Sequence, residues 1–348
     1  MTSFVNQVQN PPLYPAFFWK GRGESKAYLG FGEGKSSPIK LKIRSFYPGS
    51  SQGVWEGFPS EWDFIPDQLV SSDENLTLSQ TPLPPCLSRS DLPSQEEWIQ
   101  SVTDVKQLIK DNILHKIVLA RQTTLTFASP VSPYTVLTHL MSLGSTTSLF
   151  MVQLDPETAF MGATPELLFS REGHLLKTEA LAGTLLEHEL WSTKEFAEVD
   201  AVRVYLQEKL LPYCESLEWK APEEKKFRHL KHLYQKLEGV LKPHVLDDVL
   251  ITALHPTPAL GGAPKNRALD YLKKHEPFDR GWYGSPIGLV KESTSEIAVG
   301  IRSLLIRGHE VHLFSGAGIV KESDPLKEWE EIERKIAHLL QWFKTAPL

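Results

Sequence analysis

The stretch from Val311 to Lys335, VHLFSGAGIVKESDPLKEWEEIERK, decides how the rest of the chain is interpreted. Its first residues favour a β-strand. Ser315-Gly316-Ala317-Gly318 then predicts a tight turn at which the backbone can approach a ligand closely. Asp324-Pro325 is typical of a helix start, with Asp as the N-cap and Pro in the first helical position. The stretch therefore predicts a strand, a glycine turn, a cap and a helix, in that order.

The predicted helix has two different faces. Apolar residues recur at spacings of three and four and predict the buried face: Trp329, Ile332, Ile336, Leu339, Leu340 and Phe343. Glu328, Glu331 and Lys335 fall on another face. Two carboxylates one turn apart can hold a hard cation such as magnesium. The same spacing also suits a solvated face with an intrahelical Glu–Lys pair, so this helix alone leaves both interpretations open.

Composition and charge narrow the class of protein. The 348 residues are 41% hydrophobic and 23% charged, which is ordinary for a globular protein. A net charge of -6 without any basic run argues against a nucleic-acid partner. Cys86 and Cys214 form neither a disulfide framework nor a CxxC motif. The chain shows no signal-peptide pattern at its start and no apolar run long enough for a bilayer, so we expect a cytoplasmic protein without a membrane partner.

Strand-like segments dominate the first half of the chain. They include AFFW, KAYLGFG and IKLKIRSFY within residues 15–50, and later segments at 147–154, 158–162 and 174–184, the last running into a glycine turn. Residues 71–93 are polar and rich in proline, which predicts a surface loop or a domain boundary; we expect a loop, because no independent core precedes it. Ser94-Gln-Glu-Glu97 is a capping box that predicts a helix.

Two polar residues stand at positions from which they could reach a ligand. Lys116 opens the predicted strand HKIVLARQTTLTF and shares a face with Val118 and Ala120. It is either a solvated edge charge or a functional amine. Glu166 directly follows a proline and precedes an apolar strand, so it lies at a bend. It is either an exposed turn carboxylate or a group aimed into a cleft.

A second ExxE motif lies far from the first in the sequence. Glu195 and Glu198 fall three residues apart on a helix predicted to run to about residue 211. Ser192-Thr-Lys-Glu195 has the form of a capping box, which explains Glu195 without any ligand. If the two ExxE helices face each other they supply up to four carboxylates. Burying those without a cation is prohibitive, so a metal is their natural partner.

The C-terminal half alternates loops, helices and strands. Residues 216–228 are charged and predict a loop, whereas 247–254 and 265–274 predict helices that flank the loop HPTPALGGAP. A strand pair is expected at 286–291 and 296–306. Arg302 interrupts the second of these strands. It is either an edge charge in an ion pair or a bidentate carboxylate binder.

Taken together, the motifs resemble the chorismate-utilising enzymes, which include isochorismate, salicylate, anthranilate and aminodeoxychorismate synthases. The resemblance covers about residues 94–345, and the first 90 residues match only loosely. Eight motifs carry it in order: KIVLAR (116–121), TPELLF (164–169), EALAGT (179–184), KEFAE (194–198), HPTPALGGAPK (255–265), GWYGSPIG (281–288), IAVGIRS (297–303) and SGAGIVKESDP…EWEEIERK (315–335).

This resemblance implies a fold, a cofactor and a set of site residues. The expected fold is α/β (α+β): one domain over residues 1–348, with a variable strand region at 1–90, a catalytic core at 94–345, two stacked mainly antiparallel sheets and outer helices. Magnesium is expected to hold the ring carboxylate of chorismate. The metal ligands implied are Glu198 and Glu331, with Glu195 and Glu328 in support. The substrate contacts implied are Gly183, Ala259, Tyr283, Arg302, Gly316, Gly318 and Lys335.

Within the family, the motifs favour isochorismate synthase. Lys116 stands where the amine-using members lack lysine, and as a neutral base it would activate water for attack on C2 of chorismate, while Glu166 would protonate the departing C4 hydroxyl. Ala182 argues against aminodeoxychorismate synthase. Ala259 stands where salicylate and anthranilate synthases have a hydroxyl or another pattern. We expect a monomer without a glutaminase subunit, serving menaquinone, siderophore or salicylate biosynthesis.

Two alternatives stay open from the sequence, a salicylate synthase and a non-catalytic paralogue. Val199, where many relatives have His, and Thr164, where Ser is commoner, depart from the family pattern. Glu179 lies close to the implied site in the sequence, but the resemblance assigns it no role.

Overall fold

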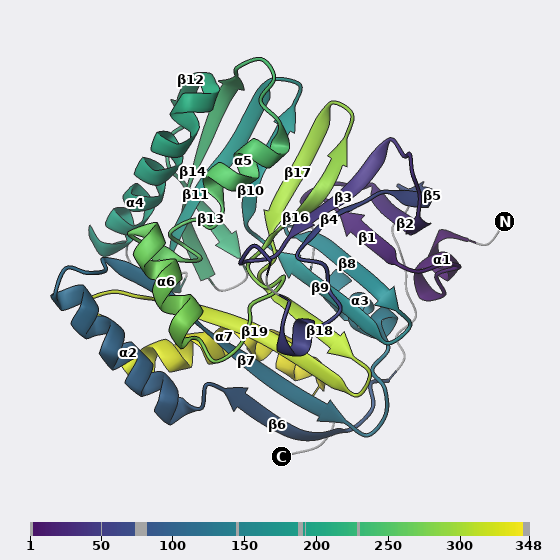
Figure 1. Cartoon of the computed structure of the whole chain (residues 1–348), viewed down its shortest axis with the longest axis horizontal. Coiled ribbons are helices and arrows are strands. Elements are labelled where there is room, and N and C mark those ends of the chain that lie inside the picture. The colour runs from purple at the N-terminus through teal and green to yellow at the C-terminus, as the bar shows by residue number, and fades with distance from the viewer. Residues whose placement is uncertain are drawn as a thin grey trace.

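Two large antiparallel sheets organise the molecule (Figure 1). The computed structural model describes residues 3–49, 51–73, 82–143, 146–186, 191, 193–227 and 230–343, with the backbone alone for 181–186, 193–198, 225–227 and 230–232. No helix in these ranges is long and apolar enough to span a membrane. The fold is a single mixed α/β domain, as the sequence predicts.

One sheet has ten strands within the described chain. Its spatial order is β15 (Gly262–Ala263), β7 (Lys116–Phe127), β19 (Glu310–Ile319), β18 (Ser303–Arg307), β9 (Thr158–Thr164), β8 (Ser148–Asp155), β1 (Ala16–Lys20), β2 (Ala27–Glu33) and β5 (Pro66–Ser72), and β6 (Cys86–Leu92) also pairs with β7. The N-terminal strands β1 and β2 are thus integral to a sheet whose other half carries the family motifs.

The second sheet has nine strands within the described residues. Its order is β12 (Cys214–Trp219), β14 (Leu230–Leu241), β11 (Leu175–Leu186), β10 (Leu167–Glu172), β17 (Thr294–Val299), β16 (Pro286–Lys291), β3 (Ile39–Arg44) and β4 (Glu61–Phe64), and β13 (Glu223–Phe227) pairs with β14. The chain passes between the two sheets at β9–β10 and at β17–β18, and both of these crossings carry predicted site residues.

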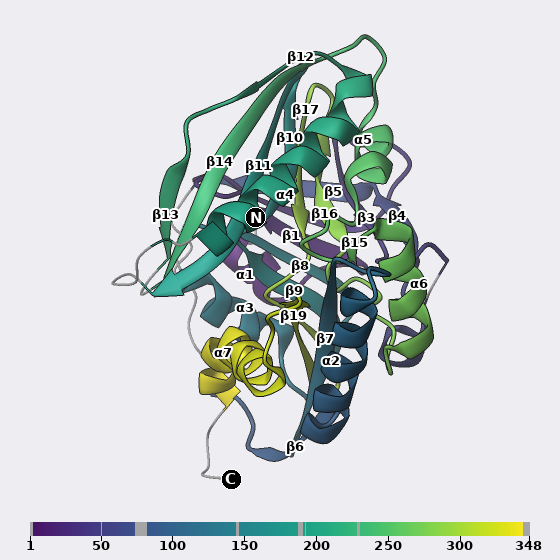
Figure 2. The ribbon, with the colours of Figure 1, turned by 90° about the vertical axis from the view of Figure 1, so that its left-hand side faces the viewer.

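Helices cover the outer faces of both sheets (Figures 1 and 2). The apolar faces of α1 (Phe4–Gln9), α3 (Pro133–Met141) and the C-terminal half of α7 (Pro325–Phe343) pack on the ten-stranded sheet. The helices α4 (Thr193–Leu210) and α5 (Asp247–Leu254) pack on the nine-stranded sheet. The helices α2 (Gln95–Lys110) and α6 (Lys265–His275) pack with β7 and β19. The predicted capping box of α2 is present, with Ser94 and Glu97 each accepting from the other's backbone N–H.

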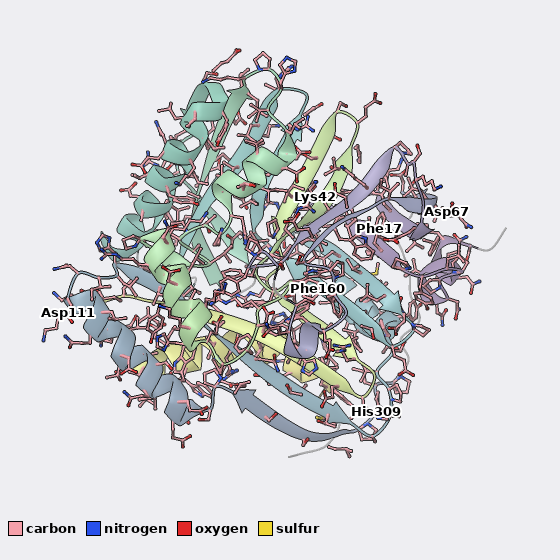
Figure 3. The ribbon with its side chains drawn as sticks, viewed as in Figure 1. Phe17, Lys42, Asp67, Asp111, Phe160 and His309 are labelled. Carbon is pink, nitrogen blue, oxygen red and sulfur yellow. The ribbon has the colours of Figure 1, made fainter. Side chains whose placement is uncertain are left out.

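An aromatic core fills the space between the sheets. Phe17 and Phe160 from the ten-stranded sheet are fully buried against Leu41 and Ile287 from the other. Figure 3 shows Phe17 and Phe160 inside the molecule, with Asp67, Asp111 and His309 at its edges. Trp55 of the short 3₁₀ helix η1 (Gly53–Trp55) closes this core by stacking on Phe314. Because the core joins strands from both sheets, it fixes their relative placement.

Three sequence predictions about local structure are wrong. Residues 315–318 form no turn: β19 continues to Ile319 and pairs with β7 throughout, and the chain turns only at 320–324. The segment 216–228, predicted as a loop, contains the strands β12 and β13, and residues 86–92 of the predicted surface loop form β6. In β19, pairing with β7 and β18 outweighs the glycine content. The strands β6, β12 and β13 lie at sheet edges, where polar and charged side chains are tolerated.

The predicted strand 296–306 is also wrong as a single element. It divides into β17 and β18, which belong to different sheets. Arg302 lies at the division with a φ of 51°, in the left-handed region that residues other than glycine rarely adopt. Similarly, the predicted glycine turn at 183 lies inside β11, where the pairing with β14 shifts register between Ala182 and Thr184.

Candidate active site

The first wall of the candidate site is the paired start of β7 and end of β19. Lys116 is half-buried at the first position of β7, and Gly318 pairs with Val118 on the adjacent strand. A Cβ atom added at Gly318 would lie 2.7 Å from Lys116 Cε and 3.3 Å from its Nζ. The lysine side chain therefore crosses the space that a glycine leaves open, which gives the glycine a role without a turn.

Glu166 enters the site from the crossing between β9 and β10. Its backbone N–H donates to Thr164 Oγ1 (3.3 Å) and its carbonyl accepts from the N–H of Val299 (3.0 Å), so the bend is tied to the end of β17. Burial among protein atoms and, to a smaller extent, the charge of Glu179 raise the pKa of the Glu166 carboxyl group to about 7, against the opposing effect of Lys116 and Lys335. Glu166 as a residue is only partly buried, as a residue that meets a ligand must be.

Tyr283 and Arg302 lie close enough for the charge of Arg302 to act on the Tyr283 hydroxyl. Tyr283 is buried and stacks on Phe314 with ring centroids 5.2 Å apart, which brings its hydroxyl within 3.2 Å of a Cβ position at Gly316. Burial raises the pKa of Tyr283 to about 12, so the hydroxyl keeps its proton. Arg302 Nη1 donates to the carbonyl of Lys335 (2.7 Å), and no ion pair joins Arg302 to a carboxylate among the described residues.

The N-terminal half of α7 supplies the remaining charges. Lys335 Nζ lies 2.6 Å from Glu331 Oε1 and donates to the carbonyl of Gly316 (2.8 Å). The intrahelical Glu–Lys pair considered from the sequence is therefore present, and it is anchored to β19 as well. Glu328 lies half-buried one turn before Glu331. The negative charge of Glu331 acts on Arg302, which places α7 and the β17–β18 crossing side by side.

Ala259 lines a pocket together with Glu166 and Glu179. The pocket also includes Thr257, whose buried hydroxyl has no hydrogen-bond partner in the described part of the chain. The loop that carries both residues is held by Tyr205, whose hydroxyl donates to the carbonyl of Leu254 (2.9 Å). Ala259 therefore lies where its side chain can influence whatever Glu166 contacts.

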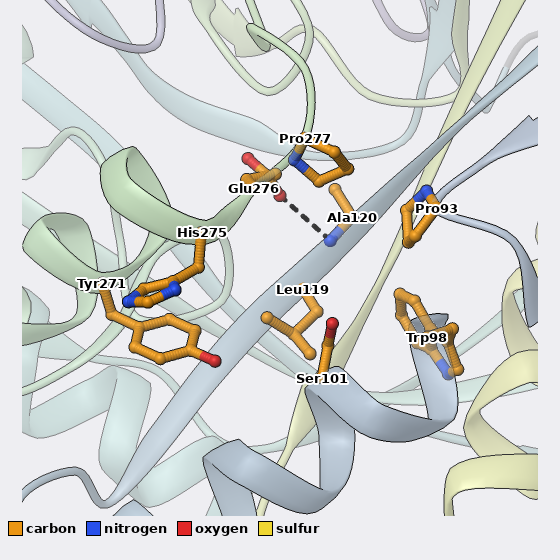
Figure 4. Close-up of a pocket in the computed structure, with 9 residues that line it drawn as sticks. All are labelled: Pro93, Trp98, Ser101, Leu119, Ala120, Tyr271, His275, Glu276 and Pro277. Atoms are coloured by element: carbon orange, nitrogen blue, oxygen red, sulfur yellow. Dashed lines mark hydrogen bonds between the residues drawn. The ribbon is translucent and has the colours of Figure 1, made fainter. Parts of the chain in front are cut away.

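A buried ion pair supports β7 just beyond Lys116. Arg280 and Glu276 pair at 2.7 Å, both almost fully buried. Arg280 donates to the carbonyl of Val118 (2.7 Å), and Glu276 accepts from the N–H of Ala120 (3.2 Å), the bond drawn in Figure 4. The pair bonds successive backbone groups of β7, so it fixes the strand that carries Lys116.

The structure thus brings most of the predicted site residues together. Seven of them touch or act electrostatically on one another: Lys116, Glu166, Tyr283, Arg302, Gly316, Gly318 and Lys335. Ala259 shares a pocket with Glu166. Gly183 lies in β11, and its surroundings are outside the description. The side chains of Glu195 and Glu198, at the start of α4, are also outside it. Within the described side chains, no three acidic, His or Cys residues form a metal-binding group.

One residue of this region escaped sequence reasoning, and it pairs with Glu179, to which the sequence assigned no role. Arg22, in the connection from β1 to β2, forms a bidentate ion pair with Glu179 at 2.8 Å. Arg22 lies in the loosely matching N-terminal region, 157 positions from its partner. Only its glycine neighbours in the sequence GRGE mark it as a turn residue, and nothing in that pattern indicates an ion pair.

Comparison with known proteins identifies the family of the chain. Residues 60–344 match the family model described as chorismate binding enzyme. The chain belongs to the chorismate-binding enzyme family. Among the relatives of this chorismate-binding enzyme, the isochorismate synthase MenF of Haemophilus influenzae is 36% identical, with 97% of this chain and 88% of that protein covered. MenF of Escherichia coli is 34% identical over 71% of this chain and 60% of its own length.

Solved structures show the same fold. The menaquinone-specific isochorismate synthase MenF of Escherichia coli matches this chorismate-binding enzyme with a TM-score of 0.87 at 24% identity, covering 99% of this chain and 92% of that one. A structure described as a putative 2,3-dihydroxybenzoate-specific isochorismate synthase, DhbC from Bacillus anthracis, matches with a TM-score of 0.83 at 23% identity, covering 99% and 100%. The two stacked sheets predicted from the sequence are therefore confirmed.

Proposed function

We propose that this chorismate-binding enzyme is an isochorismate synthase that converts chorismate reversibly to isochorismate. The observation that carries the proposal is the pairing of an amine and a protonatable carboxyl group in one site, Lys116 and Glu166, where the pKa of Glu166 is raised to about 7. Curated relatives at 34–36% identity carry the same name, which supports it.

In the proposed reaction, Lys116 acts as general base and Glu166 as general acid. Neutral Lys116 takes a proton from water as the water oxygen bonds to C2 of the ring. The ring double bonds shift, the C4–oxygen bond breaks, and Glu166 protonates the oxygen that leaves as water. A carboxyl group with a pKa near 7 is protonated in a useful fraction at neutral pH, which suits this role.

The carboxylates of a dianionic substrate would meet the cationic side of the site. Arg302 and Tyr283 would hold the pyruvyl carboxylate, because a guanidinium and a buried hydroxyl donate hydrogen bonds from adjacent positions. Lys335 would contribute a further positive charge. Gly316 and Gly318 leave β19 without side chains, so Tyr283 and Lys116 lie close against its backbone. We propose that substrate held by these residues contacts the β19 backbone beside them, and we assign the same role to Gly183 in β11.

Magnesium is the cofactor we propose. The half-buried carboxylates of Glu328 and Glu331, one helical turn apart on α7, provide the oxygen ligands that this hard cation prefers. Glu195 and Glu198 on α4 would complete the set. When bound, the ion would neutralise and orient the ring carboxylate of the substrate.

Water as the nucleophile also bears on the partners of the chain. No ammonia has to be delivered, so we propose that the chain acts without a glutaminase subunit. We further propose that it is a monomer in the cytoplasm. A salicylate synthase would go on to eliminate pyruvate. A non-catalytic paralogue would bind carboxylate ligands and would need neither Lys116 nor Glu166.

One product assay separates these possibilities. Purified protein is incubated with chorismate and magnesium, and products are resolved by chromatography, with pyruvate measured by lactate dehydrogenase. We expect the same equilibrium mixture of chorismate and isochorismate whether the reaction starts from chorismate or from isochorismate. Stoichiometric pyruvate would identify a salicylate synthase, and unchanged chorismate would identify a paralogue without activity.

A further inference from the structure

A second carboxylate, Glu179, lies beside the proposed acid and is held by a residue from the other sheet. Arg22 Nη1 and Nη2 donate to Glu179 Oε1 and Oε2, each at 2.8 Å. The same guanidinium donates to the carbonyl of Pro165 (3.0 Å), the residue before Glu166. Arg22 thus joins the β1–β2 connection, β11 and the Glu166 bend.

The Glu179 carboxylate is enclosed by donors. Its side chain is 1% exposed, and Oε1 also accepts from the N–H of Leu167 (3.2 Å), the residue after Glu166. Tyr234 on β14 donates its hydroxyl to the same carboxylate. Bonds therefore hold the residues on both sides of Glu166, from Arg22 at Pro165 and from Glu179 at Leu167. Such an arrangement fixes where the Glu166 side chain leaves the backbone.

We propose that Glu179 is a positioning residue for the reaction, which with Arg22 holds the Glu166 bend and keeps a negative charge beside the Glu166 carboxyl group. The inference rests on the proposed role of Glu166 as the acid. A buried ion pair is weak support for stability, because desolvation offsets most of its attraction. Its position against the acid gives it a second purpose: a fixed negative neighbour disfavours ionisation of Glu166.

The charges around this pair define the expected direction. Glu166 faces Glu179 on β11, Lys116 on β7, Lys335 on α7 and Tyr283 before β16. Around the pair itself, Glu296 on β17 accepts from the N–H of Arg22 (3.4 Å), and Glu24 and Glu223 act from farther away. Removing the charge of Glu179 leaves Glu166 with Lys116, Lys335 and an uncompensated Arg22, and all three favour its ionised form.

The test is a carboxyl titration of the full chain without substrate. The protein is labelled with ¹³C at glutamate Cδ, and the Glu166 signal is assigned by its loss in Glu166→Gln. In Glu179→Gln we expect the pKa of Glu166 to fall by about one unit. In Arg22→Gln, where Glu179 keeps its charge and loses its cation, we expect the pKa to rise. Arg171→Ala, which breaks the buried Arg171–Asp247 pair at the far end of β10, is the matched control and should lower Tm without moving this titration.

Turnover provides the second measurement. Glu179→Gln should lower kcat about tenfold with little change in KM, with the largest loss at the highest pH, and Glu179→Asp should recover part of it. If Glu179→Gln and Arg22→Gln lose stability like the control while the Glu166 titration stays in place, the pair only joins the two sheets and the proposal is wrong. Should Glu179→Gln fail to fold, the Arg22→Gln titration decides alone. If the wild-type protein makes no isochorismate, the proposed function is refuted. The titration, which is made without substrate, still decides whether Glu179 affects the pKa of Glu166.

Discussion

Lys116 lies across Gly318: a methyl group at position 318 would stand 2.7 Å from Lys116 Cε. That contact meets the flexible end of a side chain, which can move aside. Gly318→Ala should therefore fold with nearly unchanged Tm but displace the Lys116 amine, and we expect kcat to fall at least tenfold.

Gly316→Ala is the informative comparison. Its Cβ would lie 2.9 Å from the carbonyl oxygen of Leu119, which is backbone and cannot move aside cheaply. We expect this variant to lose both Tm and activity. Thermal unfolding and steady-state kinetics of the two variants measure the difference. Wild-type turnover in Gly318→Ala would show that Lys116 does not act from its observed position.

The acid and the base should each contribute strongly to turnover. General acid–base groups supply about 10²–10⁴ in rate, so Lys116→Ala and Glu166→Gln should each lose at least about 10² in kcat with modest change in KM. Because Glu166 must be protonated to act as the acid, the slope of log kcat against pH should fall by about one unit as pH rises through about 7. Steady-state rates between pH 6 and 9 check both statements. Either variant retaining more than about a third of wild-type turnover would refute that residue's role.

Glu166 should also make the stability of the protein depend on pH. Its pKa is about 7 in the folded protein and near 4.5 when unfolded, so the folded state binds this proton more tightly. The stabilisation is complete below pH 4.5 and is lost as pH rises through 7. Relative to wild type, Glu166→Gln should gain on the order of 1–3 kcal/mol in unfolding free energy between pH 4.5 and 8.

Urea unfolding at several pH values measures this gain. Glu330→Gln is the matched control, since Glu330 is 67% exposed on α7 and pairs only loosely with Arg334, at 3.8 Å. Its stability difference from wild type should stay constant across the same range. If the difference in unfolding free energy between Glu166→Gln and wild type is also constant across pH, the pKa of Glu166 is not raised in the folded protein.

Metal dependence is expected to follow the carboxylates of α7. Glu331→Gln removes a proposed ligand and leaves Lys335 without its partner at 2.6 Å, so the magnesium concentration for half-maximal activity should rise at least tenfold. Circular dichroism should show an intact fold. Glu330→Gln, on the exposed side of the same helix, should keep the wild-type requirement. Full activity of the wild-type protein in excess chelator would remove the metal from the proposal.

Much of the architecture could be predicted because strands and helices leave local patterns. The period of α7, the capping box of α2 and the alternation in β7 follow from the side chains of each element alone. The failures share one cause, which is pairing with distant strands. β12 and β13 are charged edge strands that become regular only beside β14, and the glycines at 316 and 318 look like a turn until β7 is paired alongside.

In the candidate site, too, local sequence patterns could be predicted and contacts made by the tertiary fold could not. Motif resemblance located Lys116, Glu166 and Arg302, whereas the division of 296–306 between two sheets at Arg302 depends on the tertiary fold. The ion pair between Arg22 and Glu179 could not be predicted, because each residue is ordinary in its own segment. Only the stacking of the sheets brings the β1–β2 connection against β11.

The last prediction concerns where the reaction stops. Elimination of pyruvate from isochorismate transfers the C2 hydrogen to the enol ether side chain, so it requires a particular placement of that side chain. Arg302 and Tyr283 would fix its carboxylate, and Ala259 forms part of the pocket wall beside Glu166. A methyl group cannot donate a hydrogen bond to hold the side chain for elimination. We therefore expect little pyruvate or salicylate from the wild-type protein.

A hydroxyl at position 259 should shift this balance. A hydrogen bond there supplies roughly 0.5–1.5 kcal/mol, which changes the partition between release and elimination several-fold. Ala259→Thr should thus raise pyruvate formation and keep synthase activity, whereas Ala259→Val, of the same shape without the hydroxyl, should not raise it. Thr257→Ala tests the buried hydroxyl already in the lining of this pocket, which should matter less, because only 6% of Thr257 is exposed. Equal pyruvate from the Thr and Val variants would show that shape, and not a hydrogen bond, decides where the reaction stops.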